Sequence, residues 1–160
     1  MPSLLTSIVL CFYLLSFFLC ICHDIWSRTL PSYLLFGLFL FGVPAFLLRL
    51  VSISEPFSFR GILQLMLSFA PGALLLLLGL FSGEAVGFGD GLFFLLSGCY
   101  IPGLPLLLIL LLGLFTSALV SIGLLAYGRW KGKSMRKRSI PFLPCLIPAL
   151  PILLRAFPSL

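Results

Sequence analysis

The long segments without Asp, Glu, Lys or Arg constrain this chain more than any other feature of its sequence. A helix of about 20 apolar residues crosses the roughly 30 Å of hydrocarbon in a bilayer, and five uncharged segments are of that order or longer. With only 9% charged residues, the chain lacks the side chains that cover a water-soluble domain. We therefore expect an all-α membrane protein. The uncharged segments are 1–23, 29–48, 61–83, 91–128 and 139–154.

Prolines determine how these segments divide into spans. The first three segments each predict one span, whereas 91–128 is nearly twice the required length and contains the cluster Pro102-Gly103-Leu104-Pro105, which bends or ends a helix. We divide it into a short span over 91–101 and a full span over 104–127. The four prolines of 140–157 predict a kinked or partly unwound last helix, with its break facing protein or water. The sequence thus predicts a polytopic bundle of about six transmembrane helices, forming a single domain over 1–160.

The distribution of basic residues orients this bundle. Six spans place the loops 23–31, 82–90 and 128–139 on one face, and these loops hold most of the Lys and Arg residues. The positive-inside rule then predicts that this face is cytoplasmic and that both termini lie outside the cell. The basic run from Arg129 to Arg138 is expected to contact anionic lipid, and we expect no nucleic acid partner.

The chain has only four carboxylates, and two of them lie at expected span boundaries on the same face. Asp24 ends the first span and Asp90 precedes the fourth. Carboxylates at such depths are costly unless they are paired, solvated or functional. Two adjacent carboxyl groups share one proton, which suits the activation of water against a peptide carbonyl. The alternative is that each Asp caps a helix or is solvated in a loop.

Three segments resemble, in order, the motifs of the type IV prepilin peptidases, which are membrane aspartic proteases of the GxGD kind. Residues 24–32 resemble the family's loop after the first catalytic-domain helix, 82–90 its G-x-E-x-x-G-x-G-D segment, and 140–144 its I-P-F-x-P segment. The resemblance implies an aspartic endopeptidase that removes the basic leader of prepilins or pseudopilins at the cytoplasmic face. It further implies that Asp24 and Asp90 are the catalytic pair. The chain corresponds to a short form without the N-methyltransferase domain of larger members.

Four other residues are candidates for the same site. Gly87 and Gly89 are expected to shape the loop that presents Asp90, because glycine lets the backbone bend sharply and approach other groups closely. Glu84 is a candidate for attracting a basic leader, with a solvated loop carboxylate as the alternative. Arg28 is a candidate for contacting the substrate backbone, and a positive-inside anchor explains it equally well.

The sequence also departs from the family pattern and leaves rival functions open. Leu92 stands where many relatives have Lys, which bears on activity and substrate preference, and Ser32 replaces an Asn. The rivals are a presenilin-like intramembrane protease and a non-catalytic membrane subunit or small transporter. No cofactor or metal is expected, because Cys20, Cys22 and His23 supply three ligands where a closed zinc site needs four.

Overall fold

All regular secondary structure in the described part of the chain is helical. A computed structural model describes residues 4–27, 30–52, 58–81, 87–131 and 142–156. Within these ranges there are six α-helices, one 3₁₀ helix and no strand, which confirms the all-α prediction. The elements are α1 (Leu4–Ser27), α2 (Ser32–Ser52), α3 (Phe59–Phe81), α4 (Phe88–Ser97), α5 (Gly103–Trp130), η1 (Leu143–Ala149) and α6 (Leu150–Ala156).

Four of the helices have the length and composition of membrane spans, which identifies a membrane protein. The two further expected spans, over 91–101 and 140–157, correspond to shorter apolar helices. At 1.5 Å per residue, the ten residues of α4 reach only about 15 Å, and η1 with α6 covers Leu143–Ala156. The described residues therefore supply four full-length spans where about six were expected. The four are Ser7–Ser27, Ser32–Val51, Phe59–Phe81 and Gly103–Trp130.

The prolines explain where the short helices end. The α4 helix ends at Ser97, and α5 begins after Pro102, whose missing N–H suits a position just before a helix. The break expected near 101–105 is therefore confirmed. In the last segment Pro144 and Pro148 lie within η1, which winds as a 3₁₀ helix before α6 follows. This confirms the expected partly unwound final helix.

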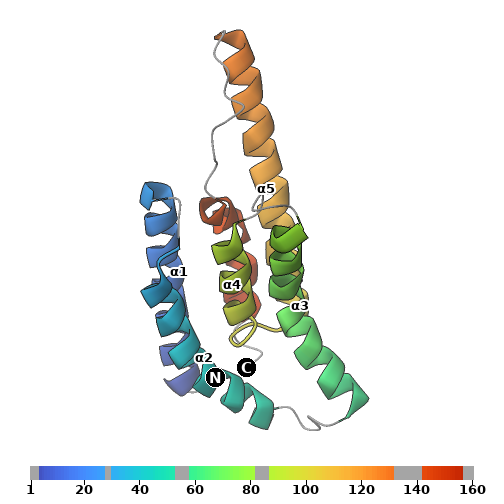
Figure 1. Ribbon diagram of the computed structural model, residues 1–160. Helices are drawn as coiled ribbons and strands as arrows, with labels where there is room; N and C mark the ends of the chain where they lie inside the picture. Colours follow the sequence, from blue (N-terminus) through green and yellow to red (C-terminus); the bar gives the residue numbers. More distant parts are fainter. Residues whose placement is uncertain (1–3, 28–29, 53–57, 82–86, 132–141, 157–160) are drawn as a thin grey trace.

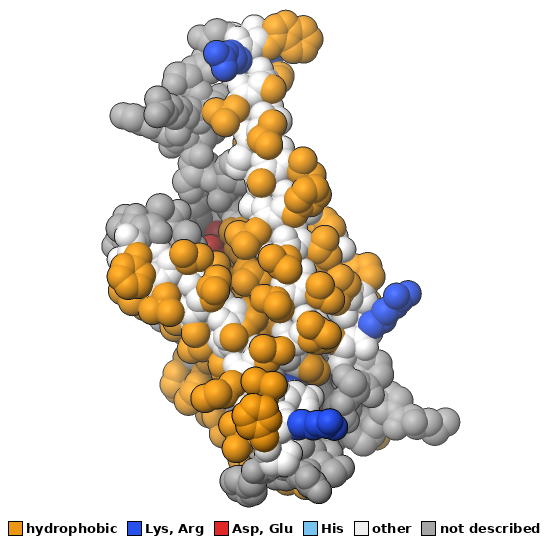
Figure 2. All heavy atoms as spheres, turned by 90° about the vertical axis from the view of Figure 1, so that its right-hand side faces the viewer, with side chains coloured by type: hydrophobic (Ala, Val, Ile, Leu, Met, Phe, Trp, Pro, Cys, Tyr) orange, Lys and Arg blue, Asp and Glu red, His pale blue; other side chains and the backbone are white. Residues whose placement is uncertain are grey.

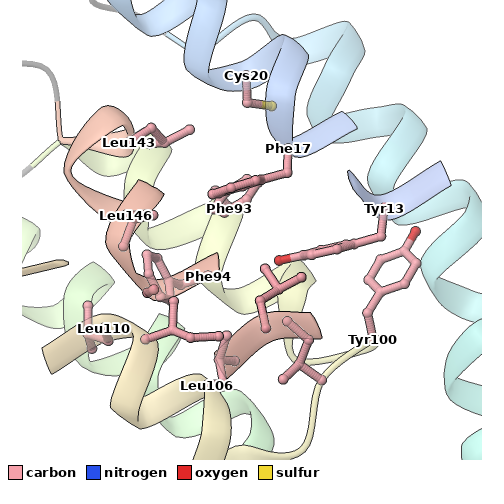
Figure 3. Packing of buried hydrophobic residues seen from close by; sticks show 14 of the residues in the cluster. Tyr13, Phe17, Cys20, Phe93, Phe94, Tyr100, Leu106, Leu110, Leu143 and Leu146 are labelled. Carbon is pink, nitrogen blue, oxygen red and sulfur yellow. The ribbon is translucent and has the colours of Figure 1, made fainter. Parts of the chain in front are cut away.

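The short helix α4 occupies the centre of the bundle. Figure 1 shows α1 and α2 on one side of it, α3 and α5 on the other, and the last segment beside it. The rings of Phe17 on α1 and Phe93 on α4 stack with their centroids 5.8 Å apart (Figure 3). Near the other end of α4, Tyr13 Oη donates a hydrogen bond to Ser97 Oγ at 3.0 Å. The core of the protein is thus built around a helix too short to cross a bilayer.

Glycines bring α3 and α4 into close contact. A Cβ atom added at Gly72 on α3 would overlap the backbone N and Cα of Leu95 on α4. A Cβ added at Gly91 would lie 2.8 Å from Leu76 Cδ2. Small residues at helix interfaces allow backbones to approach closely where water supplies no hydrophobic force. The position of α4 therefore depends on the absence of side chains at these glycines.

Arg49 anchors the turn that follows α4. Arg49 lies in the last turn of α2, and its side chain is only 4% exposed. Its Nη1 donates hydrogen bonds to the carbonyl oxygens of Gly98 (3.2 Å) and Ile101 (3.1 Å), and its Nη2 donates to Ser68 Oγ at 2.9 Å. Carbonyl groups at a helix C-terminus lack intrahelical partners. The guanidinium therefore supplies donors to a helix end buried inside the protein.

Replacing Arg49 with methionine is expected to destabilise the protein by about 3 kcal/mol, because buried carbonyl groups lose a charged hydrogen-bond donor. The Gly98 and Ile101 oxygens are the groups affected. Unfolding in mixed micelles with increasing dodecyl sulfate measures the change. Arg60→Met is the matched control, since Arg60 is exposed on α3. Equal stability of the two variants would contradict a structural role for the Arg49 contacts.

The α5 helix extends well beyond the ends of its neighbours (Figure 1). Its 28 residues correspond to about 42 Å. Most side chains between 118 and 130 are exposed, and most are apolar; on the face seen in Figure 2, hydrophobic side chains cover this part of the helix up to the basic residues near its tip. The projecting half of α5 thus has the surface of a membrane helix but no packed neighbour within the described residues.

Candidate active site

Asp24 lies in the last turn of α1 and is almost completely buried, with 6% of its surface exposed. Its Oδ2 accepts a hydrogen bond from the backbone N–H of Leu143 at 3.1 Å. The backbone amide of Phe142 also interacts with this carboxyl group. The first expected catalytic residue is therefore held by the start of the last segment, 119 residues further along the chain.

The geometry of η1 explains why the Leu143 amide is available. The first N–H groups of a helix have no intrahelical carbonyl to bind, and Leu143 is the first residue of η1. Pro144, which follows, has no N–H to compete for the carboxylate. On its far side η1 is fixed to α5, where Thr116 Oγ1 donates a hydrogen bond to the carbonyl oxygen of Cys145. The donor to Asp24 is thus placed by packing of the last segment against α5.

Asp90 lies in the first turn of α4 and is half-buried. Its backbone N–H donates to the carbonyl oxygen of Gly87 at 3.0 Å. Burial, and then the negative charge of Asp24, raise the pKa of Asp90 to about 7. The charge of Asp24 therefore reaches the carboxyl group of Asp90, and a shared catalytic site stays a prediction.

Gly87 and Gly89 provide space around Asp90 and its neighbours. A Cβ atom at Gly87 would lie 2.9 Å from Asp90 Oδ2, and one at Gly89 would lie 3.1 Å from Leu30 Cβ. The expected sharp bend is absent at Gly87, whose φ of −61° and ψ of 119° suit any residue. The glycine is required here for close approach: a side chain would displace the Asp90 carboxyl group.

Part of this site reaches the molecular surface. Figure 2 shows acidic side-chain atoms recessed at the foot of the projecting half of α5. Asp24 and Asp90 are the only acidic residues in the described ranges. At least one carboxyl group of the pair is therefore visible from outside the bundle, at the place where α5 leaves its neighbours.

Two expected site residues lie outside the described ranges. They are Glu84 and Arg28, and the basic run from residue 132 onward also lies outside these ranges. Arg129 and Lys131 are described, and both are exposed at the tip of α5. The roles predicted for Glu84 and Arg28 therefore stay predictions.

The cysteines of α1 do not form a metal site in the described part of the chain. Cys20 is buried and Cys22 is exposed, so their side chains point to different surroundings. No group of three or more His, Cys, Asp or Glu side chains in the described ranges is arranged to hold a metal ion. The pair of carboxyl groups is thus the arrangement in these ranges with evident capacity for acid–base chemistry.

Sequence reasoning missed two groups that hold the site. The backbone N–H of Leu143 has no side-chain signature, although the I-P-F-x-P resemblance had marked its segment. Arg49 is ambiguous in the sequence, because an arginine near a span end is commonly an interfacial anchor; only the folded structure shows that its side chain is buried.

Known proteins add no support to the assignment of this site. No family model matches the chain, and no curated protein or solved structure matches it. A function for the site is therefore argued from its own geometry.

Proposed function

We propose that this chain is a membrane-embedded aspartic endopeptidase that cleaves the basic leader of prepilin or pseudopilin substrates at the cytoplasmic face. The observation that carries the proposal is the electrostatic coupling of Asp24 and Asp90, which come from helices far apart in sequence. The resemblance of segments 24–32, 82–90 and 140–144 to the prepilin peptidases supplies the substrate class. The chemistry itself requires only the two carboxyl groups and water.

The coupled pair supports hydrolysis by general acid–base catalysis. Like charges held close together cannot both ionise, so near neutral pH the pair retains one proton. The ionised carboxylate accepts a proton from a bound water while the protonated carboxyl group donates to the carbonyl oxygen of the peptide. Each of the two proton transfers is expected to increase the rate of water addition by about 10²–10⁴-fold.

The competing interpretation is that Asp24 only caps a helix. The hydrogen bond from Leu143 to Asp24 fits that role. It does not account for Asp90, however, whose pKa is raised by burial and by the charge of Asp24. A capping role for Asp24 does not explain why a second carboxyl group is half-buried within reach of its charge, where ionisation is costly.

The proposed orientation places the loops 23–31, 82–90 and 128–139 in the cytoplasm and both termini outside. Asp24 and Asp90 lie at one end of the bundle, which is compatible with this arrangement. The short α4 and the segment Leu143–Ala156 would complete the six-helix bundle. Exposed Arg129 and Lys131, together with the basic residues up to Arg138, would bind anionic lipid headgroups.

The direct test is co-expression with a prepilin that has a basic leader and a Gly-Phe junction. The wild-type chain is expected to remove the leader, which a gel shift detects. A double variant, Asp24→Asn with Asp90→Asn, is expected to leave the precursor intact. A substrate whose leader Lys and Arg residues are replaced by Ser is the matched control, and it should be cleaved more slowly. An uncleaved precursor with the wild-type chain would reject this proposal.

One observation favours a second candidate function, that of a presenilin-like intramembrane protease. Asp24 lies within the apolar span Ser7–Ser27 and is almost fully buried. A substrate with its scissile bond inside an apolar span separates the two candidates in the same assay. Cleavage of that substrate, with the prepilin left intact, would favour the intramembrane protease.

A further inference from the structure

We propose that the two carboxyl groups have fixed and different roles: Asp24 carries the negative charge and acts as the base, whereas Asp90 holds the shared proton and acts as the acid. The assignment of catalytic roles rests on the proposed function above. The location of the proton does not, because it is a property of the folded pair with or without a substrate.

The hydrogen-bond geometry carries this assignment. An amide N–H can donate but cannot accept, so a carboxyl oxygen bound to it must act as an acceptor, and the ionised form is the stronger acceptor. The Leu143 N–H makes such a bond to Oδ2 of Asp24. Among the described residues, burial and the charge of Asp24 act on the Asp90 carboxyl group, and no hydrogen-bond donor acts on it. The negative charge therefore has its stabilising donor on Asp24.

The segment around Leu143 keeps that donor in place. Leu143 is fully buried in the core, and the N–H of Cys145 is engaged by the carbonyl oxygen of Phe142 at 3.0 Å. Phe142 itself packs its ring against Phe94 of α4, with centroids 6.2 Å apart. The same short segment thus contacts the helix that carries Asp90 and donates to Asp24.

The other titratable groups around Asp24 come from three elements. The charge of His23 acts on Asp24 from its own helix, and the charge of Asp24 in turn acts on Cys20 of that helix, on Cys145 of η1 and on Asp90 of α4. Asp90 is the one other carboxyl group in this set. Burial and the negative charge of Asp24 both raise its pKa. Because burial acts on both carboxyl groups, the hydrogen bond from the Leu143 N–H to Asp24 is the observation that places the proton on Asp90.

Fixed roles give one order of proton transfers. As water forms a C–O bond to the peptide carbonyl carbon, its proton passes to Asp24, and the carbonyl oxygen takes the proton of Asp90. The resulting gem-diol then collapses: Asp24 returns its proton to the leaving nitrogen, Asp90 regains one from a diol hydroxyl, and the C–N bond breaks. Both carboxyl groups end in their starting states, and one water is consumed.

Infrared difference spectroscopy tests the assignment without any need for cleavage, because a protonated carboxyl group has its own C=O stretching band. The chain has only four Asp and Glu residues, and ordinary carboxyl groups, with pKa values of about 4, are ionised at pH about 6. The wild-type protein in lipid nanodiscs is expected to show a single protonated carboxyl at that pH. Its band should disappear as the pH rises through about 7, the value to which burial raises the pKa of Asp90.

Single variants assign that band. Asp90→Asn is expected to remove it at pH about 6, and Glu55→Gln, in a separate part of the sequence, is expected to leave it unchanged. Asp24→Asn should keep the band but lower its midpoint, because the repelling charge is lost while burial remains. Loss of the band in Asp24→Asn with retention in Asp90→Asn would overturn the assignment, and so would its absence from the wild-type protein. If the wild type and the variants show the expected bands but the protein has no protease activity, only the proposed function is rejected.

A backbone variant tests the donor itself. Leu143→Pro removes the N–H at the first position of η1, where proline is tolerated, and Leu143→Ala shortens the side chain but keeps the N–H. In the Asp90→Asn chain, the Asp24 band is expected to appear at higher pH with proline at position 143 than with alanine. Identical titrations would show that the Leu143 amide does not set the charge of Asp24.

Discussion

Replacing Asp24 with asparagine is expected to slow leader removal by about 10⁴-fold, whereas Asp90→Asn slows it by about 10²-fold; both values lie within the range for loss of a general acid or base. The asymmetry follows from the proposed roles. Asparagine at position 24 still accepts the Leu143 hydrogen bond through its carbonyl oxygen, but it cannot take a proton from water. Asparagine at position 90 cannot transfer a proton, yet its amide still donates a hydrogen bond to the peptide carbonyl.

Cleavage rates of the purified variants with one peptide substrate measure this difference, and circular dichroism checks that each variant keeps its helices. Glu55→Gln is the matched control, because it removes a carboxyl group outside the proposed site. Rates for Asp24→Asn within a few-fold of wild type would exclude Asp24 as the base. Equal decreases in cleavage rate for Asp24→Asn and Asp90→Asn would support a catalytic pair but reject the proposed division of roles.

The second large effect is expected at the contact between α3 and α4. Gly72→Ala is expected to destabilise the protein by about 3 kcal/mol, the upper end of the usual range for an overpacked core. The new Cβ would overlap the backbone of Leu95 and lie 2.8 Å from its Cβ, so α4 must move as a whole. Because α4 carries Asp90, cleavage should fall together with stability.

Gly123→Ala provides the matched control for this substitution. A Cβ at Gly123 in α5 would meet nothing within 4 Å, and alanine in a helix interior is favoured over glycine by about 0.5–1 kcal/mol. Unfolding in dodecyl sulfate mixed micelles should therefore show a lower free energy of unfolding for Gly72→Ala and a higher one for Gly123→Ala. Similar small effects at both positions would mean that α4 is not held at the distance described.

The sequence predicted the helices well where an uncharged segment contained no cluster of prolines. Segments 1–23, 29–48 and 61–83 became α1, α2 and α3 with nearly the expected limits. The expected span over 91–101 became α4, displaced to Phe88–Ser97. The limits of α4 depend on contacts that composition does not reveal. The Arg49 side chain binds the turn after α4, and Gly72 leaves space for α4 to pack closely against α3.

The candidate site was predictable only as far as side chains reveal it. Two scarce carboxylates at span boundaries identified Asp24 and Asp90, because charge in an apolar chain is costly and therefore informative. The donor to Asp24 is a backbone N–H, and any residue except proline carries one. The packing of η1 against α5 brings the Leu143 amide to Asp24. This packing is a property of the folded chain and has no signature in the sequence.

The length of α5 links the site to the thickness of the surrounding lipid. A rod of about 42 Å fits within about 30 Å of hydrocarbon only at a tilt near the steep end of the usual range, and α5 leaves its neighbours at the place where acidic atoms are visible. In the proposed orientation, longer acyl chains would cover more of the projecting half and place the two carboxyl groups deeper below the headgroups. The distance that water and the proposed substrate travel to reach Asp24 and Asp90 would then depend on both the fold and the bilayer.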